Sequence, residues 1–373
     1  MSRFRFIAVA AALVGVFALA LAACGGDDDS GGSSGSSNSS SGGGGGGGSI
    51  ALLLPESKTA RYESQDRPNF EKKVKELCSD CDIIYSNVDQ DAAKQQQQAE
   101  AAITKGAKVL VLDPVDAASA GAIVNRAKQS KIPVISYDRL ITDADIDYYI
   151  SFDNAKVGKL QGDALVKKLK DDGKKGSIVM INGAPTDNNA KLFKEGAHSV
   201  IDSSGFKVAK EYDTPDWSPD KAQQEMEQAI TAIGKGGFVG VYAANDGTAG
   251  GAIAAMKGNG IDPKTIATTG QDAELAAIQR ILAGEQYMTI YKAIKPEAEQ
   301  AAELAVALAK GETPPEATDK VNNGMKDVPS FILNPVSVTV DNIKDTVVKD
   351  GFWSVDEICT GKYAAACKKA GIQ

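Results

Sequence analysis

Histidine is nearly absent from this chain, and its scarcity limits the chemistry that the protein can perform. The 373 residues include one histidine, His198. A metal centre built from several histidines is therefore excluded, and a Ser-His-Asp triad would have to use that one residue. Because His198 falls inside a predicted helix, we expect it to have a surface or packing role.

Basic residues are also few relative to acidic ones. The chain has 41 lysines and arginines against 49 aspartates and glutamates, which gives a net charge of −8. A nucleic-acid-binding protein normally carries a basic face, so this balance argues against nucleic acid as a partner. No segment matches G-x-x-x-x-G-K-[ST], so the chain is not itself a P-loop ATPase. The remaining composition is that of a soluble globular protein, and the length allows two domains.

The first 23 residues have the pattern of an export signal. Arg3 and Arg5 precede the apolar run Phe6–Ala22, whose length is typical of a signal peptide rather than of a membrane span. The run ends in Leu21-Ala22-Ala23-Cys24, which resembles a bacterial lipobox. We therefore expect residues 1–23 to be a lipoprotein signal peptide and Cys24 to carry the lipid. The alternative is an uncleaved anchor with a chance cysteine, and both interpretations export the chain.

A glycine- and serine-rich segment follows Cys24. Of the 25 residues from Gly25 to Ser49, 12 are glycine and 9 are serine. Such a segment cannot bury apolar surface, so we expect residues 24–49 to be a disordered linker and folding to start near Ile50.

Four cysteines remain once Cys24 is set aside. An even number outside the cytoplasm favours disulfides, and we expect the local pairs Cys78 with Cys81 and Cys359 with Cys367. The alternative for Cys78 and Cys81 is a redox motif or half of a zinc site. A redox motif would begin a helix, whereas this pair ends one, and a zinc site would need a second C-x-x-C pair.

The acidic run Asp143, Asp145, Asp147 is a weak candidate for calcium. An EF-hand loop would need glycine at its sixth position and glutamate at its twelfth, where this chain has Tyr148 and Asn154. We therefore expect no metal site and no cofactor.

From Ile50 onward, short apolar runs alternate with amphipathic stretches, and the alternation occurs in two series. Strands are predicted at Ile50–Leu54, Ile83–Tyr85, Val109–Leu112, Val134–Tyr137, Tyr149–Phe152, and then at Ser177–Ile181, Lys207–Tyr212, Val239–Ala243, Ile266–Thr269 and Tyr287–Tyr291. Helices are predicted at Phe70–Leu77, Ala92–Lys105, Ala117–Lys131, Asn189–Asp202, Pro219–Ile233, Thr248–Lys257, Glu274–Ala283 and Pro296–Lys310. This pattern predicts an α/β protein with two doubly wound lobes, each built on a parallel sheet.

Ligands bind such sheets at the carboxyl ends of the strands, and the residues at those positions suit a sugar. They are rich in aspartate, asparagine and arginine, which accept from and donate to hydroxyl groups, and they include no obvious nucleophile–base pair. Tyr62 and Trp217 come from different lobes and could stack on the two faces of a ring. The alternatives are structural: Asp187, Asn245 and Asp272 could each cap a helix, Arg61 and Arg139 could form surface pairs, and Trp217 could pack over a helix start.

Several runs of residues carry a resemblance to a known family. They include Tyr137-Asp138-Arg139, Asp187–Phe193, Asn245–Gly251 and Gly270-Gln271-Asp272, and they lie in order along the chain. From Ile50 to about Gly351 the chain resembles the type I periplasmic-binding-protein family of sugar ABC importers. The Gly/Ser linker, the four cysteines and the tail from Trp353 to Gln373 depart from the family pattern and suit a membrane-anchored form.

The resemblance implies a set of sugar-binding residues. They are Arg61, Tyr62, Asp138, Arg139, Asp187, Asn189, Trp217, Asn245, Asp272 and Lys292. At the position of Tyr62, the family member that the chain resembles has a tryptophan. This difference is expected to alter the affinity for the sugar or the preferred sugar ring.

The resemblance also implies how the lobes are connected. Three crossings are expected near Ser151–Asp153, Lys292–Ile294 and Val328–Ser330. The first lobe would comprise residues 50–152 and 293–328, and the second would comprise residues 153–292 and 329–373. Sugar binding would close this three-segment hinge.

The function implied is that of an exported binding protein rather than an enzyme. It would act as a monomer that delivers a monosaccharide to a membrane permease and its ATPase. D-xylose is favoured, with ribose, arabinose, glucose and galactose as alternatives, and sensing through a membrane receptor is a further alternative. A glycosidase would need two carboxylates such as Asp187 and Asp272, but basic and amide neighbours would hold both ionised and leave no general acid.

Overall fold

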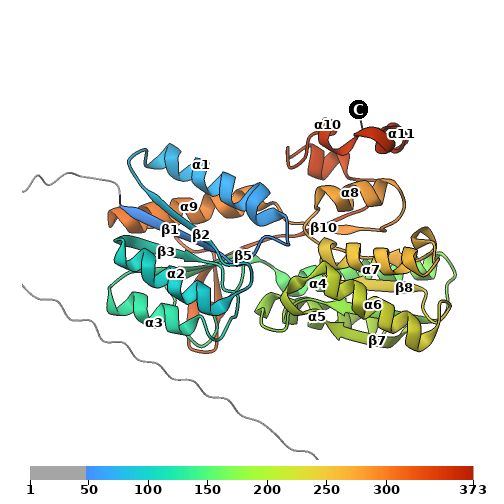
Figure 1. The fold of residues 1–373 in the computed structure, drawn as a ribbon. Coiled ribbons are helices and arrows are strands. Elements are labelled where there is room, and N and C mark those ends of the chain that lie inside the picture. The colour runs from blue at the N-terminus through green and yellow to red at the C-terminus, as the bar shows by residue number, and fades with distance from the viewer. Residues whose placement is uncertain (1–47, 373) are drawn as a thin grey trace, which may run out of the picture. The chain divides into compact units, whose positions relative to one another are not determined.

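The computed structural model describes residues 48–372. The predicted signal peptide, Cys24 and nearly all of the Gly/Ser linker lie outside the described residues. Within the described part, two α/β lobes follow one another along the chain (Figure 1). The prediction of two lobes, each with a mainly parallel sheet, is confirmed. None of the helices between residues 48 and 372 is long and apolar enough to cross a membrane.

The first lobe is built on a seven-stranded sheet with the order β11-β12-β5-β4-β3-β1-β2. All neighbours are parallel except β11 and β12. The strands are β1 (Ser49–Leu54), β2 (Ile83–Asn87), β3 (Ala107–Leu112), β4 (Val134–Tyr137), β5 (Tyr148–Phe152), β11 (Asp319–Asn322) and β12 (Asp327–Leu333). The helices are α1 (Arg67–Leu77), α2 (Ala92–Thr104), α3 (Gly121–Gln129) and α9 (Ile294–Lys310), and a π-helical turn, Tyr62–Asp66, precedes α1.

Alternation along β1 explains why helices cover both faces of this sheet. Ile50, Leu52 and Leu54 are buried against α1 and α9 on one face. Ala51 and Leu53 are buried against α2 and α3 on the other face. Because successive strand side chains point to opposite faces, a continuously apolar strand must be covered on both sides.

The second lobe is built on a parallel four-stranded sheet with the order β7-β6-β8-β9. The strands are β6 (Ser177–Asn182), β7 (Lys207–Asp213), β8 (Gly240–Ala243) and β9 (Ala267–Thr268). The helices are α4 (Asn154–Asp171), α5 (Asn188–Ile201), α6 (Pro219–Ile233), α7 (Asp246–Gly258) and α8 (Leu275–Leu282). Helices α4 and α5 share one core with the sheet, and α6 and α7 share another.

The C-terminal segment returns to the second lobe. Strands β10 (Thr289–Tyr291) and β13 (Val336–Val338) form a separate antiparallel pair. A π-helical turn (Lys344–Val348) and the short helices α10 (Val355–Ile358) and α11 (Ala364–Lys369) follow. Their apolar side chains join those of α8 in one core. The structure contains the disulfides Cys78–Cys81 and Cys359–Cys367, which is the local pairing expected from the sequence.

Three sequence expectations need correction. Helix α4 was not predicted, although it is 18 residues long. Strand β10 was predicted in the parallel sheet, but it pairs antiparallel with β13. The third crossing was expected near Val328–Ser330, but β12 stays paired with β5 as far as Leu333. The chain therefore crosses after Leu333, next to Pro335, which has no amide hydrogen to extend the ladder.

Candidate ligand-binding site

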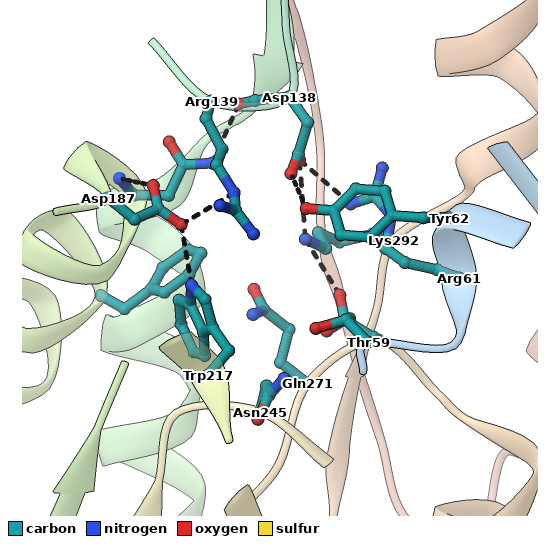
Figure 2. Close-up of a pocket in the computed structure, with 13 residues that line it drawn as sticks. Thr59, Arg61, Tyr62, Asp138, Arg139, Asp187, Trp217, Asn245, Gln271 and Lys292 are labelled. Atoms are coloured by element: carbon teal, nitrogen blue, oxygen red, sulfur yellow. Dashed lines mark hydrogen bonds and ion pairs between the residues drawn. The ribbon is translucent and has the colours of Figure 1, made fainter. Parts of the chain in front are cut away.

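A cavity lies between the two lobes, and polar and aromatic side chains line it (Figure 2). Its lining comprises Thr59, Arg61, Tyr62, Asp138, Arg139, Asp187, Asn189, Phe193, Trp217, Asn245, Gln271, Asp272 and Lys292. All ten residues that the sequence singled out as sugar-binding candidates are in this set. The free space between the side chains is about 270 Å³, including the open mouth, which is below the range typical of drug-sized ligands.

Three lining residues were not predicted. Gln271 directly precedes Asp272 after β9, so its place in the sequence was a usable signal. Phe193 lies four residues after Asn189 on α5, and residues four apart share a helix face. Thr59 lies in the loop after β1, and nothing in its neighbourhood distinguished it.

Most of these side chains follow the carboxyl ends of strands. Two of the predicted residues, Asp187 and Asn245, cap helices and also line the cavity. Asp187 caps α5 through Oδ1, which accepts from the amide of Asn189 at 2.8 Å. Its Oδ2 faces the cavity and accepts from Trp217 Nε1 at 3.1 Å. Asn245 caps α7 through Oδ1, which accepts from the amide of Thr248 at 2.9 Å. Capping and lining are therefore compatible roles for one side chain.

Arg61 is held by carboxylates of the first lobe. Its Nε and Nη2 donate to Asp66 at 2.9 and 2.6 Å, Nη2 also donates to Glu297 at 2.7 Å, and Nη1 donates to Asp138 at 3.0 Å. Four of its five N–H groups are thereby engaged, which leaves one Nη1 hydrogen for a ligand. The expected sugar-facing role of Arg61 is therefore limited to that one donor, and the residue mainly orders its neighbours.

Arg139 crosses the space between the lobes. Its Nε lies 3.1 Å from Asp187 in the second lobe and 3.5 Å from Asp113 in the first. Its Nη2 lies 3.8 Å from Glu56. Figure 2 shows its guanidinium projecting into the centre of the cavity.

Lys292 is the third cation of the cavity. Its ammonium lies 3.0 Å from Asp272 and 3.8 Å from Asp138. Like Arg139, it therefore links a carboxylate of the second lobe to one of the first. All three side chains are almost completely buried, so water screens these charges weakly.

Burial and charge set the protonation of the cavity carboxyl groups. Burial alone would raise the pKa of Asp138, but Arg61, Lys292 and Arg139 outweigh it and lower that pKa to about 2. Burial raises the pKa of Asp113 well above its usual range, although Arg139 opposes the rise. Burial likewise raises the pKa of Asp187, despite Arg139. At Asp187, desolvation is therefore a larger effect on the pKa than the opposing charge of Arg139.

Two aromatic rings lie on opposite sides of the cavity (Figure 2). The Tyr62 hydroxyl donates to Asp138 at 3.2 Å. Trp217 contacts the edge of Phe193, with ring centroids 6.3 Å apart. The Trp217 ring also covers Gly183 so closely that a Cβ there would lie 2.0 Å from Cη2 of the indole. A glycine is thus required beneath the indole.

Backbone strain is concentrated at this site. Asp138, Trp217 and Asp272 have φ values of 52°, 52° and 91°, in the left-handed region that non-glycine residues rarely adopt. Such conformations cost about 1–3 kcal/mol each and persist where the surroundings hold them in place. The fold therefore accepts strain to aim these three side chains into the cavity.

The arrangement is suited to binding rather than to covalent chemistry. Carboxylates, amides and cations surround a small space between two aromatic rings, which matches a molecule with hydroxyls at its edge and apolar faces. Within residues 48–372, no group of three or more His, Cys, Asp or Glu side chains is placed to hold a metal ion. His198 lies outside the cavity lining and contacts Asp202 and Glu211.

Comparisons with known proteins agree with this geometry. The family model described as "Periplasmic binding protein domain" matches residues 50–313. The D-xylose-binding periplasmic protein of Escherichia coli (strain K12) is 43% identical over 313 residues, which cover 83% of this chain and 92% of that protein. The multiple sugar-binding periplasmic receptor ChvE of Rhizobium radiobacter is 35% identical, covering 83% and 92% of the two chains.

A solved structure of a sugar-bound protein has the same fold. The ABC transporter solute-binding protein of Clostridium phytofermentans, with bound β-D-glucose, superposes with a TM-score of 0.75. It is 30% identical, and the match covers 83% of this chain and 99% of that one. These relatives are binding proteins rather than enzymes.

Proposed function

The chain belongs to the periplasmic binding protein family, and from that premise we propose that it binds a monosaccharide and delivers it to the permease of an ABC importer. One observation carries the proposal: all ten candidate residues, drawn from both lobes, line a single small cavity. The family places such proteins outside the cytoplasm, which agrees with the predicted export signal.

D-xylose is the monosaccharide that we propose first. Relatives named for D-xylose binding are 41–43% identical over most of the chain, above the relatives named for multiple sugars. In this proposal Asp138, Asp187 and Asp272 accept from sugar hydroxyls, Arg139 and Lys292 donate to them, and Asn189 and Asn245 exchange hydrogen bonds with them. Tyr62 and Trp217 cover the two faces of the ring.

Closure of the lobes would couple sugar binding to delivery. Arg139 with Asp187, and Lys292 with Asp138, already bring the lobes together in this structure. A sugar that adds contacts to both lobes favours this closed arrangement over an open one. The moving bodies would be residues 50–152 with 293–333, and residues 153–292 with 334–373, and a monomer would suffice.

The N-terminus would tether the protein to the membrane. We propose that residues 1–23 are removed and that Cys24 carries the lipid, so that the Gly/Ser linker lets the lobes reach a permease on the same membrane. Metabolic labelling with a fatty-acid analogue tests this directly. Label on the parent chain and none on Cys24→Ser would support the anchor, and equal labelling would contradict it.

Calorimetric titration with D-xylose, L-arabinose, D-ribose, D-glucose and D-galactose tests the ligand. We expect one-to-one binding that is tightest for D-xylose, with a change in tryptophan fluorescence that Trp217→Phe removes. Tighter binding of another sugar would keep the site and overturn the choice of D-xylose. Failure of all five sugars to bind would overturn the proposal.

A second candidate function is sugar sensing through a membrane receptor, and one relative carries the word receptor in its name. Sensing would use the same cavity and the same closure. Deleting the permease separates the two functions, since uptake of labelled sugar would stop while a sugar-dependent response would persist only if the protein also signals.

A further inference from the structure

The C-terminal segment, residues 336–372, contacts the loop that carries Asp272 into the cavity between the lobes. Within this segment Trp353 begins the tail that departs from the family pattern, and its Nε1 donates to the backbone carbonyl of Ala273 at 2.8 Å. Ala273 directly follows Asp272, which lines the cavity. Figure 1 shows α10 and α11 of this segment next to α8, whose core they share. The tail is therefore adjacent to the sugar site.

The loop of residues 269–274, which follows β9 and precedes α8, has a strained backbone. Asp272 and Ala273 have φ values of 91° and 48°, so two successive non-glycine residues lie in the left-handed region. Conformations of this kind persist only where the surroundings hold them in place. The contacts of the loop therefore decide whether Asp272 keeps the orientation that faces the cavity.

Strand β10 binds the amides of this loop, but it does not bind the carbonyl of Ala273. The amide of Asp272 donates to the carbonyl of Ile290 at 2.8 Å, and the amide of Ala273 donates to Thr289 Oγ1 at 3.2 Å. The first turn of α8 uses the carbonyl of Glu274 rather than that of Ala273. The carbonyl of the buried Ala273 accepts instead from the indole of the C-terminal segment. An unpaired buried carbonyl is costly, so loss of the indole N–H would release the loop.

The same segment packs against the residue that precedes Lys292. Phe352 contacts Tyr291 edge to face, with ring centroids 5.1 Å apart, and Trp353 contacts Phe352 in the same way at 5.5 Å. Tyr291 and Phe352 are both buried. Asp272 lies 3.0 Å from the ammonium of Lys292. The two aromatic residues of the segment therefore contact a chain neighbour of each member of this ion pair.

Phe352 also connects the C-terminal segment to the first lobe. Its carbonyl accepts from Gln65 Nε2 at 3.1 Å. Gln65 belongs to the π-helical turn Tyr62–Asp66 of the first lobe, whereas Phe352 lies in a core of the second lobe. Separating the lobes breaks this hydrogen bond, and neither residue lines the cavity. The bond therefore favours the closed arrangement without a contact to the sugar.

We propose that Trp353 is a positioning residue for the sugar site. Its indole N–H holds the strained loop and thereby keeps Asp272 directed at the sugar hydroxyls. The hydrogen bond between Phe352 and Gln65 makes the C-terminal segment part of the closed arrangement, which the sugar also favours. The proposal rests on the proposed sugar-binding function, because Trp353 acts on the sugar only through Asp272.

The first experiment measures D-xylose affinity in a double-mutant cycle of Trp353→Phe and Asp272→Gly. Phenylalanine keeps an aromatic ring but cannot donate to the carbonyl, and glycine removes the carboxylate at a backbone position whose φ of 91° suits it. We expect Trp353→Phe to weaken binding roughly 5- to 20-fold in the parent and less than about twofold in Asp272→Gly, where the positioned group is already gone. Calorimetry measures the tighter variants, and the fluorescence of Trp217 follows binding in the weaker ones.

Asn189→Ala is the matched control background for this cycle. Asn189 lines the cavity but bonds to Asn154 and Asp138 rather than to the loop, so Trp353→Phe should weaken binding there as much as in the parent. A purely structural tryptophan would cost the same affinity in all three backgrounds. That result, or parent-like affinity in Trp353→Phe, would overturn the proposal. If the parent bound none of the five sugars, the proposed function would fail and this inference would fail with it.

Trp353→His separates the N–H group from the rest of the indole. Histidine Nε2 can occupy the same position on a five-membered ring as the indole Nε1, whereas the second ring is lost. We therefore expect Trp353→His to bind D-xylose more tightly than Trp353→Phe. The opposite order would show that ring packing rather than the hydrogen bond to Ala273 supports the site, and would overturn the proposal.

The connection to the first lobe is tested with Gln65→Ala. The change removes the hydrogen bond to Phe352, so we expect D-xylose affinity to fall about 2- to 10-fold. Gln96→Ala on α2 is the control, because its amide bonds within the first lobe to Glu100 at 3.1 Å, and it should bind as the parent does. Equal affinity of the two variants would overturn the contribution of this bond to closure, while the double-mutant cycle decides the positioning of Asp272.

Discussion

Arg139 and Asp187 come from different lobes and meet in the cavity, where Nε of the guanidinium lies 3.1 Å from Oδ2 of the carboxylate. The same oxygen accepts from Trp217. Arg139 follows β4, and Asp187 caps α5 in the second lobe. The carboxylate of Asp187 thus pairs with Arg139 of the first lobe, accepts from Trp217 and caps α5. A ligand that contacts this carboxylate therefore interacts with groups held by both lobes.

Replacing Arg139 with alanine should weaken sugar binding. The change removes a buried charged donor and leaves Asp187, Asp113 and Glu56 without their shared cation. We expect a loss of about 2–3 kcal/mol, or roughly 30- to 150-fold in Kd, by calorimetry. Arg126→Ala on α3 is the control and should bind as the parent does. An unchanged affinity in Arg139→Ala would remove this residue from the site.

Adding one methyl group at Gly183 should displace the indole of Trp217. The new Cβ would lie 2.0 Å from Cη2, a distance that no packing tolerates, so the ring must move. We expect Gly183→Ala to weaken sugar binding at least tenfold and to reduce the fluorescence change on binding. Gly236→Ala is a matched control because its Cβ would meet nothing within 4 Å. Parent-like affinity in Gly183→Ala would show that Trp217 does not contact the sugar.

The sequence predicted the two series of strands and helices because their periodicity is set by burial on one or both faces. It missed α4, since that helix opens with Asn154 and contains Gly158 and Gly162, which read as loop residues. Gly158 is needed for packing, because a Cβ there would lie 1.9 Å from the carbonyl oxygen of Phe193 on α5, and a Cβ on Gly162 would lie 3.1 Å from the carbonyl oxygen of Ala197. Close approach of two helices cannot be read from one of them alone.

The region of the site was predictable because the carboxyl ends of parallel strands meet at one edge of the sheet. The individual residues were then identified from the resemblance to the family. What the sequence could not give is the partner of each side chain. Arg61 was expected to face the sugar, but Asp66, Asp138 and Glu297 hold most of its donors. Glu297 is distant in sequence and lies on α9, so this contact arises from tertiary packing.

Glu297 should stabilise the protein through Arg61 rather than through the ligand. The two groups are 2.7 Å apart and completely or almost completely buried. Burial raises the pKa of Glu297 well above its usual range, although Arg61 opposes the rise. Because this desolvation offsets part of the pairing and because Asp66 and Asp138 remain as partners of Arg61, we expect Glu297→Gln to lower the free energy of unfolding by about 1–1.5 kcal/mol in denaturant titrations. Glu299→Gln on the same helix pairs weakly with Lys295 at 3.9 Å and should change it by less than about 0.5 kcal/mol. Equal stability of the two variants would contradict the structural role.

Asp246 should make the second lobe less stable as the pH rises. Burial raises the pKa of this carboxyl to about 7 against the opposing charge of Arg280, whereas its ordinary value is 3.8. Between those two values the folded protein binds more protons than the unfolded chain, so the free energy of unfolding falls as pH increases. The fall is at most about 1.4 kcal/mol per pH unit for one group and ends above pH 7. Burial also raises the pKa of the neighbouring Glu274 to about 8, which adds a decline in the same direction.

Denaturant titrations between pH 4 and pH 8 measure this dependence in the parent protein and in Asp246→Asn. In the parent protein, Glu274 N and Thr289 Oγ1 each donate to Oδ2 of Asp246 at 2.9 Å. The amide of the variant stays neutral over this pH range, and its carbonyl oxygen can accept from the same donors. We expect the variant to lose a substantial part of the decline below pH 7 and to retain a reduced part due to Glu274, because the charge of Asp246 also raises the pKa of Glu274. Asp220→Asn, at an exposed position at the start of α6, should keep the parent profile. A parent-like slope in Asp246→Asn would mean that this carboxyl is ionised in the folded protein across the whole range, with its burial offset by Arg280 and the surrounding donors.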